Sequence, residues 1–306
     1  MSKFMKPTAI LLCLFLVASL FVACDNGQGE DSPKESLDNQ VESSVGEEDQ
    51  TQEEVLQPRE SLEFISNGDG TCYVNGIGTC KDKEITIPQT SPTGDVVTAI
   101  IRGAFSGCSS LTSITIPDSV TSISDSAFRN CSSLTSVTIP NSVTSINGCA
   151  FDGCSSLTSI TIPDSVTNIS NSAFSNCSSL TSVTIPDSVT IIGEMAFKSC
   201  SSLTSITIPD SVTSIGVYAF WACSSLTSIT IPDGITTIGD YAFYGCSSLT
   251  SITIPDSVTS IGEMAFDDCS KLTDIYFTGT EEEWRAINKT GSYIPTTATI
   301  HFNYTP

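Results

Sequence analysis

Thirteen cysteines and a single histidine are the residues of this sequence with the most obvious chemistry. Catalysis by a Ser-His-Asp or Cys-His arrangement, or a histidine-rich metal site, would have to use His301 alone. The sequence also lacks the G-x-G-x-x-G, phosphate-loop, H-E-x-x-H and G-x-S-x-G motifs. We therefore predict a protein that is not an enzyme and that uses no metal or cofactor. A glycan-cleaving site built from scattered carboxylates is the enzymatic alternative.

Eight of the cysteines recur at a strict interval of 23 residues, which is not the spacing of a metal-binding site. Metal sites favour C-x2-C clusters of mixed ligands, whereas a single file offers no closed tetrahedron. Stacked parallel side chains also rarely meet the dihedral angle of a disulfide. We expect the regularly spaced cysteines to fill one buried column of the core. Cys72 and Cys80 are the pair most suited to a disulfide, and Cys149, outside the column, is a candidate reactive thiol. The column recurs every 23 residues, at Cys108, Cys131, Cys154, Cys177, Cys200, Cys223, Cys246 and Cys269.

The charge of the chain excludes several classes of partner. The sequence has 12 Lys plus Arg against 34 Asp plus Glu, a formal net charge of −22. Such a chain repels nucleic acids and anionic lipid headgroups. We therefore expect no nucleic-acid partner, and contact with a membrane only through a lipid anchor.

The first 60 residues have the pattern of an exported lipoprotein. Lys3 and Lys6 precede a short apolar run that ends in Ser19-Leu20-Phe21-Val22-Ala23-Cys24. This pattern predicts a signal peptide over 1–23 and resembles a bacterial lipobox, in which Cys24 is lipidated. Ordinary signal cleavage, with Cys24 incidental, is the alternative. Residues 24–60 are acidic and without periodicity, so we expect a disordered tether.

The rest of the chain repeats one 23-residue unit, C-S-S-L-T-S-I-T-I-P-D-S-V-T-S-I-G-x-x-A-F-x-x. A fixed period of this length is typical of a solenoid. In each unit L-T-S-I-T-I predicts a strand, Pro ends it, and Ala-Phe is expected on a single helical or 3₁₀ turn. We expect Gly or Asn two residues after Phe to adopt a left-handed conformation. Glycines such as Gly193 and Gly216, which follow the second apolar segment, are expected to permit a bend.

These units resemble the BspA-like, cysteine-containing 23-residue class of bacterial leucine-rich repeats over about residues 72–277. Thr71-Cys72-Tyr73-Val74 is similar to the N-terminal cap of that family, and Thr278–Trp284 to its C-terminal cap. The resemblance implies a solenoid with parallel strands on one face and turns with short 3₁₀ or helical segments on the other. Serines such as Ser142 stand near the place where ordinary leucine-rich repeats have an Asn ladder. The expected division is a cap and degenerate first repeat over 61–107, tandem repeats over 108–269 and a C-terminal cap over 270–306.

Two surfaces of the predicted solenoid could bind a ligand. Outward strand positions, such as Ser159 and Thr161, form a uniform hydroxyl face that would suit a repetitive polymer, a glycan or ice, or would simply be a soluble β-face. The residues around Ala-Phe differ between units, and four aromatic residues there are 23 residues apart in pairs. We expect each pair to stack at about 5 Å on adjacent coils, and we name them as candidate ligand-binding residues, with packing of the solenoid surface as the alternative. They are Tyr218, Trp221, Tyr241 and Tyr244.

The resemblance implies a surface-exposed adhesin or ligand-binding protein. We predict a lipid-anchored adhesin at the outer membrane or cell surface that binds an extracellular protein or glycan. The alternative is a structural scaffold that associates with itself through its edges and its hydroxyl face.

Overall fold

The computed structural model describes residues 62–78, 81–289, 291 and 294–306. They belong to one compact unit, Glu60–Pro306, which contains every described residue of the hydrophobic core. The expected signal peptide, Cys24 and the tether lie outside the described residues, as does Cys80. Among the described residues, no helix is long and apolar enough to cross a membrane.

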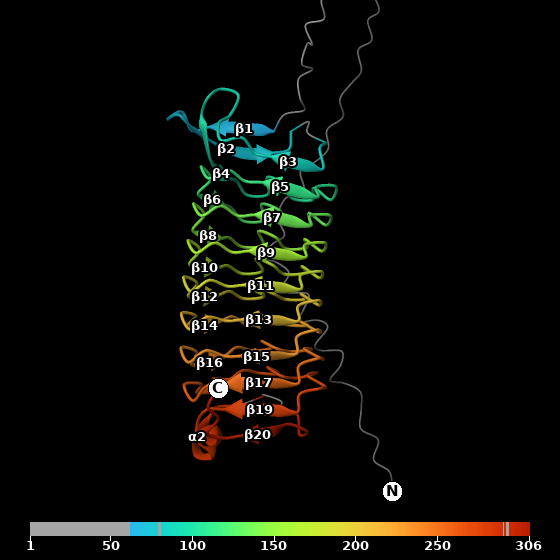
Figure 1. Cartoon of the computed structure of the whole chain (residues 1–306), viewed down its shortest axis with the longest axis vertical. Coiled ribbons are helices and arrows are strands. Elements are labelled where there is room, and N and C mark those ends of the chain that lie inside the picture. Colours follow the sequence, from blue (N-terminus) through green and yellow to red (C-terminus); the bar gives the residue numbers. More distant parts are fainter. Residues whose placement is uncertain (1–61, 79–80, 290, 292–293) are drawn as a thin grey trace, which may run out of the picture. The chain divides into compact units, whose positions relative to one another are not determined.

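The 23-residue units form the coils of a solenoid, which are stacked from β2 at one end to β20 at the other (Figure 1). Each repeat coil has two short strands, so two ladders run along the stack. One ladder is a ten-stranded sheet in the order β1-β2-β4-β6-β8-β10-β12-β14-β16-β18. Its strands are β1 (Glu63–Ser66), β2 (Thr71–Gly76), β4 (Val96–Ile100), β6 (Ser122–Ile123), β8 (Ser145–Ile146), β10 (Asn168–Ile169), β12 (Ile191–Ile192), β14 (Ser214–Ile215), β16 (Thr237–Ile238) and β18 (Ser260–Ile261).

The other ladder contains the strands that the L-T-S-I-T-I segments predict. It consists of a six-stranded sheet, β13-β11-β9-β7-β5-β3, and a four-stranded sheet, β15-β17-β19-β20. Its strands are β3 (Glu84–Thr86), β5 (Ser113–Thr115), β7 (Ser136–Thr138), β9 (Ser159–Thr161), β11 (Ser182–Thr184), β13 (Ser205–Thr207), β15 (Ser228–Thr230), β17 (Ser251–Ile254), β19 (Asp274–Phe277) and β20 (Thr299–His301). The leucine-rich-repeat solenoid is therefore confirmed, with a ladder of very short strands in addition to the predicted one.

Local sequence explains where each strand starts and stops. In β5 the β-branched Ile114 points inward and is 3% exposed, while Thr115 is exposed to solvent. Pro117 cannot donate to the ladder, and the Val120 N–H bonds to the Pro117 carbonyl at 3.0 Å, which closes a turn. The strands of successive repeats pair in parallel with a register of 23 residues, as for Ser182 and Ser205. Residues 23 apart therefore lie one above the other.

The Ala-Phe segments are hydrogen-bonded turns rather than helices. Ala127 N–H bonds to Ser124 O at 3.2 Å within its coil, whereas Phe128 N–H bonds to Ala150 O at 2.8 Å in the next coil. A left-handed residue, Asn130 with φ 58°, follows Phe128, as the sequence predicts. A second left-handed residue precedes Ala127, which was not predicted: Ser126 has φ 56°. Successive backbone N–H groups of each turn therefore bond alternately to a carbonyl of the same coil and to a carbonyl of the next coil.

Close packing between coils accounts for Gly193 and Gly216. Neither glycine has a positive φ, so neither is needed for a left-handed bend. A Cβ on Gly216 would lie 2.6 Å from the carbonyl carbon of Gly193 on the neighbouring coil. These glycines are required because the coils approach each other too closely there for a side chain.

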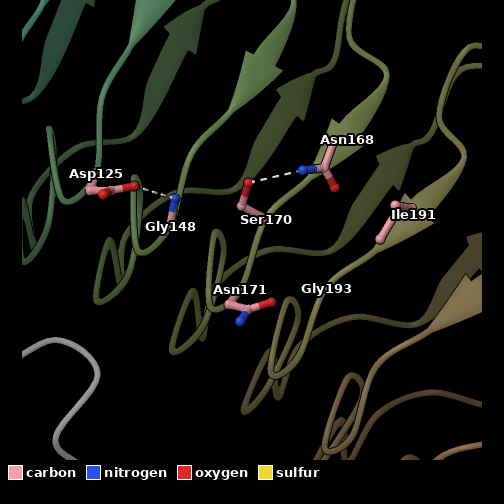
Figure 2. Close-up of a pocket in the computed structure, with 7 residues that line it drawn as sticks. All are labelled: Asp125, Gly148, Asn168, Ser170, Asn171, Ile191 and Gly193. Carbon is pink, nitrogen blue, oxygen red and sulfur yellow. Dashed lines mark hydrogen bonds between the residues drawn. The ribbon is translucent and has the colours of Figure 1, made fainter.

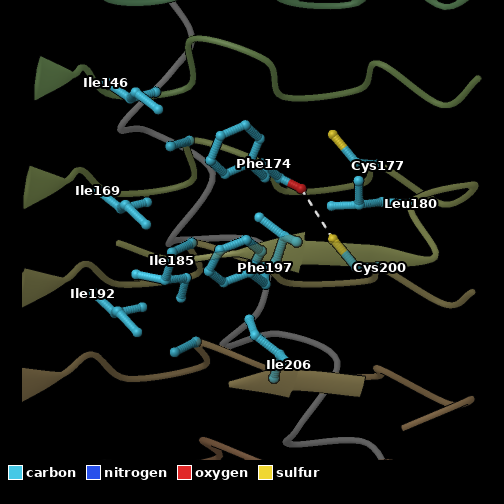
Figure 3. Packing of buried hydrophobic residues seen from close by; sticks show 14 of the residues in the cluster. Ile146, Ile169, Phe174, Cys177, Leu180, Ile185, Ile192, Phe197, Cys200 and Ile206 are labelled. Carbon is cyan, nitrogen blue, oxygen red and sulfur yellow. Dashed lines mark hydrogen bonds between the residues drawn. The ribbon is translucent and has the colours of Figure 1, made fainter. Parts of the chain in front are cut away.

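The core consists of stacked columns of identical side chains (Figure 3). The phenylalanines from Phe105 to Phe266 form one continuous stack, with ring centroids 5.2–5.7 Å apart. Beside them, the thiol of Cys200 donates to the carbonyl of Phe174 on the preceding coil at 3.2 Å, and the same bond recurs along the column. The eight repeat cysteines are free thiols, as predicted, and all except the half-buried Cys108 are buried.

Two expectations about the remaining cysteines are wrong. Cys72 is a free, buried thiol that donates to Asp95 O at 3.5 Å, so it is not half of a disulfide. Cys149 is disulfide-bonded and is therefore not a reactive thiol.

The two ends of the stack are closed by different structures. At the N-terminal end β1 pairs antiparallel with β2. At the C-terminal end a short helix, α2 (Glu281–Ala286), begins at Thr280, whose side chain and that of Glu283 form a capping box. Trp284 of α2 is 6% exposed and packs edge-on against Phe277, with ring centroids 5.2 Å apart. The acidic residues of the first turn, Glu281, Glu282 and Glu283, are exposed and complement the positive end of the helix dipole.

Candidate functional site

The four candidate aromatic residues form one cluster on the surface of the solenoid, which we call the aromatic patch: Tyr218, Trp221, Tyr241 and Tyr244. The 23-residue register places Tyr241 above Tyr218, with ring centroids 4.9 Å apart and ring planes 14° apart. It also places Tyr244 against Trp221 at 6.1 Å and 8°. The predicted stacking is therefore confirmed, although the second pair is wider than the expected 5 Å.

A contact between the two columns, which the sequence does not reveal, joins the two pairs. The rings of Tyr241 and Tyr244 are 5.9 Å apart and tilted by 50°. They are three residues apart along one turn, and only the conformation of that turn decides whether they meet. All four rings are half-buried, so each one packs on the solenoid and also presents part of its surface to solvent.

The backbone beneath two of these rings is unfavourable for a bulky residue. Tyr218 and Tyr241 have φ of 59° and 55°, in the left-handed region that favours Gly and Asn. The same column contains Gly103, Ser126 and Ser172 on other coils, all with positive φ. The left-handed turn is thus a property of the fold, and tyrosine is not the residue that the backbone prefers there.

The ends of the patch carry opposite charges. Lys198, one coil before Trp221 in the same column, has its Nζ 5.1 Å from the centre of the indole ring. Asp267 occupies the same column one coil after Tyr244. A neutral aromatic surface therefore lies between a cation and an anion, an arrangement that suits a largely uncharged ligand with polar ends.

The hydroxyl face has a different character. Ser159 and Thr161 of β9 are exposed, as are the equivalent residues from β7 to β15, and within the described part of the chain their hydroxyls form no hydrogen bond. The neighbouring threonine column is used by the fold, because Thr181 Oγ1 donates to Thr158 O of the preceding coil at 3.2 Å. The face is regular and identical from coil to coil, so nothing in it distinguishes one position from another.

The other residues whose side chains could take part in a reaction, His301 and the column cysteines, have structural roles. His301 Nε2 lies 2.7 Å from Asp274 Oδ1, and its ring stacks on Tyr276 with centroids 4.8 Å apart. The hydrogen bond from His301 lowers the pKa of the Asp274 carboxyl. Burial raises the pKa of the Cys200 thiol to about 12, so this column is poorly suited to nucleophilic chemistry. Across the described ranges, no group of three or more His, Cys, Asp or Glu side chains is placed to hold a metal ion.

A family model for the BspA type leucine rich repeat region matches this chain over residues 78–204 and 190–292, in six copies. The chain belongs to the BspA-type leucine-rich-repeat family. The match spans the coils that carry the aromatic patch and the whole hydroxyl face from β7 to β15. No curated protein matches the chain.

Solved structures of bacterial leucine-rich-repeat proteins resemble this BspA-type chain. A leucine-rich repeat protein from Bacteroides ovatus is 28% identical over 79% of this chain and 75% of its own, with a TM-score of 0.62. The leucine rich repeat protein of T. pallidum is 26% identical over 79% of this chain and 98% of its own, with a TM-score of 0.51. A leucine rich cell surface protein from Faecalibacterium prausnitzii is 29% identical over 76% of this chain and 97% of its own, with a TM-score of 0.36. Stacked repeats of this kind present extended surfaces for binding or scaffolding.

Proposed function

We propose that this BspA-type protein is a non-enzymatic adhesin that binds an extracellular protein or glycan through the aromatic patch. The observation that carries the proposal is the contact of four half-buried rings on two adjacent coils of an otherwise repetitive surface. Aromatic residues are enriched at the centres of protein interfaces, and their flat faces also suit sugar rings. The net charge of −22 disfavours nucleic acids and other polyanions as partners.

Other coils of the solenoid stack without an aromatic residue at these positions. The column that contains Trp221 and Tyr244 has Ser175 in another coil, and the column of Tyr218 has Ser172. Coils with serine at these positions stack in the same register as coils with aromatic residues. The side chains are therefore dispensable for stacking, which supports a role in recognition.

Binding of the compact unit Glu60–Pro306 to immobilised matrix proteins, plasma proteins and glycans tests the proposal. The test variant is Trp221→Ser with Tyr244→Ser, which introduces the residue that this column has at Ser175. The control is Ser106→Ala with Ser175→Ala, in the same column away from the patch. We expect saturable binding that weakens by at least about tenfold in the test variant only. Binding that survives in a folded test variant would move the site away from the patch.

Lipid anchoring at Cys24, on the outer membrane or cell surface, is part of the same proposal and is supported by the lipobox-like sequence. A multiply acylated cysteine would hold the protein stably on a membrane. We expect labelled fatty acid to be incorporated into the full chain in a bacterial host and to be absent from Cys24→Ser. Incorporation that is unchanged in this variant would refute the anchor.

Two other functions predict different results. A self-associating scaffold predicts a molecular mass by light scattering that rises with protein concentration and no saturable ligand. A glycan-acting enzyme predicts the release of reducing ends from a polysaccharide. A monomer that binds a ligand without releasing reducing ends would support the adhesin.

A further inference from the structure

A hollow of about 380 Å³ lies on the solenoid surface, apart from the aromatic patch, where three successive coils differ from the repeat pattern (Figure 2). Along one surface column, Asp125 and Asn171 are two coils apart, with Gly148 between them. At about 4.8 Å per coil, these two side chains stand some 10 Å apart at their base. Gly148 adds no side chain to the hollow, and a Cβ there would lie 3.3 Å from Asp125 Oδ1.

The two flanking side chains are held in place by the backbone of the next coil. Asp125 Oδ1 accepts a hydrogen bond from Gly148 N–H at 2.9 Å, and Asn171 Oδ1 accepts one from Glu194 N–H at 3.0 Å. These bonds orient both groups and leave Asp125 Oδ2 as an acceptor and Asn171 Nδ2 as a donor. The hollow is thus flanked by one acceptor and one donor whose positions are fixed before any ligand arrives.

The strand wall of the hollow contains an acceptor without a partner. Asn168 of β10 donates from Nδ2 to Ser170 Oγ at 3.3 Å, while its Oδ1 is buried and has no hydrogen-bond partner. Buried polar atoms in folded proteins are almost always satisfied, so an orphaned acceptor calls for an explanation. Most repeat coils have Ser or Thr in this column, at Ser145 and Ser214 for example, whereas Asn168 and Ile191 on the next coil depart from this pattern.

An apolar side chain lies beside this amide. Ile191 of β12 pairs with Asn168 in the parallel ladder, lines the same hollow and is 44% exposed, one of three large apolar side chains that are exposed among the described residues. Figure 2 shows Asn168 with its amide nitrogen turned toward Ser170 and with Ile191 next to it. Two successive coils thus replace the usual hydroxyl residues with an amide and an exposed apolar group.

We propose that this hollow binds one neutral sugar unit. Sugar hydroxyls both donate and accept, which matches Asp125 Oδ2, Ser170 Oγ and Asn171 Nδ2, with Ser170 Oγ held in place by Asn168 Nδ2, and the apolar C–H face of a sugar ring would pack on Ile191. No Lys or Arg lines the hollow, and the chain is strongly acidic, so an anionic ligand does not fit. A single carboxylate without further acidic ligands does not suit a metal ion. The site goes beyond the proposed adhesin function and does not depend on what the aromatic patch binds.

Ligand-observed saturation-transfer NMR on the Glu60–Pro306 unit tests the site with the methyl glycosides of glucose, galactose, mannose and N-acetylglucosamine. N-acetylneuraminic acid is the anionic comparison. One test variant is Asn168→Ser, which introduces the residue found at Ser145. The other is Gly148→Val, which fills the gap with the residue that the same column has at Val217. Thr237→Ser, in the column of Asn168 on a distant coil, is the matched control.

We expect at least one neutral glycoside to bind, and its Kd to rise at least about tenfold in each test variant, because the site loses either the hydrogen bond that positions Ser170 or its space. Binding should be unchanged in Thr237→Ser and in the Trp221→Ser, Tyr244→Ser variant. Thermal unfolding would show that each variant is folded, and Asn168→Ser alone decides the matter if Gly148→Val does not fold. Absence of binding by all four glycosides, unchanged binding in a folded Asn168→Ser variant, or loss only in the aromatic variant would overturn the proposal.

Discussion

Single serine side chains connect neighbouring coils at most of the turns that follow the prolines. Ser188 Oγ donates to Val166 O at 2.6 Å, and Ser211 Oγ donates to Val189 O at 2.7 Å. The serines thus form a hydrogen-bonded ladder of their own. It lies near the place where ordinary leucine-rich repeats have a ladder of Asn side chains. Two positions of the column lack this bond among the described residues: the Ser119 hydroxyl has no hydrogen-bond partner, and Gly234 stands between Ser211 and Ser257.

Gly234→Ser should therefore stabilise the protein. The Cβ at this position would lie 3.1 Å from the Val212 carbonyl oxygen, and a serine there would fill the gap in the ladder between Ser211 and Ser257 after a small adjustment. The new hydrogen bond and the lower entropy of the unfolded chain should together add about 0.5–1.5 kcal/mol to the free energy of unfolding. Urea unfolding would measure the change, and Gly234→Ala separates the two contributions. A decrease in stability for Gly234→Ser would contradict the role given to the serine ladder.

Gly216→Ala should have the opposite effect. Its Cβ would approach the Gly193 carbonyl carbon to 2.6 Å, whereas a Cβ on the equivalent Gly239 would lie 3.2 Å from the nearest atom, Val217 N. Backbone cannot move aside as a side chain can, so we expect a loss of about 1–3 kcal/mol for Gly216→Ala. The loss should be smaller for Gly239→Ala. Equal effects of the two substitutions in thermal unfolding would show that coil spacing does not select glycine here.

At the scale of the elements, the cysteine column acts as a second ladder beside the phenylalanine stack. Each thiol from Cys131 to Cys269 donates to the carbonyl of the Phe that lies 26 residues earlier. Sulfur fills the space beside the ring and adds a second hydrogen bond to a carbonyl that already accepts one from a backbone N–H of its own coil, two roles that alanine could not combine. Burial raises the pKa of the Cys177, Cys223 and Cys246 thiols well above the usual value and that of Cys269 to about 12.

This column predicts a loss of stability at alkaline pH. An unfolded thiol ionises near pH 8.5. Above that pH the unfolded state loses protons that the folded state keeps, so the free energy of unfolding falls as pH rises. Each thiol with a raised pKa should contribute a slope of about 1.4 kcal/mol per pH unit until its folded-state pKa is reached. Urea unfolding at about pH 7.5 and 9.5 measures the slope, and Cys200→Ala with Cys223→Ala should make it shallower. An identical slope in this variant would refute the prediction.

At the scale of the whole molecule, stability is a sum over similar coils. Nearly all strand pairs join residues 23 apart, and within the described ranges no repeat strand pairs with one more than a single coil away. In such a solenoid each unit contacts only its neighbours. The length of the stack is therefore free to change, while its register is not.

Deletion of residues 177–199, one full period, should leave a folded and shorter solenoid. The new junction joins Asn176 to Cys200, so every column of the core stays in register. Deletion of 178–199, one residue fewer, would shift each later coil and place polar side chains in the core. We expect cooperative thermal unfolding for the first variant and an unfolded or insoluble product for the second. Similar behaviour of both variants would contradict a register-dependent core.

Most of the architecture is determined by residues within a single 23-residue unit and can therefore be predicted from the sequence. Ile114 and Ile116 predict a strand, Pro117 predicts its end, and the period of 23 predicts which side chains stack, including Tyr218 on Tyr241. Repetition makes these inferences secure, because every unit must satisfy the same geometry as its neighbours.

Only the tertiary structure decided how the coils touch. The close approach at Gly216, the hydrogen bonds from Cys200 and Ser188, the contact of Tyr241 with Tyr244 and the hollow beside Asn168 all depend on distances between coils or across a turn. The sequence pattern identifies the neighbour in each case but not its distance or direction. Those are determined by the close packing of adjacent coils, which no single 23-residue unit can form alone.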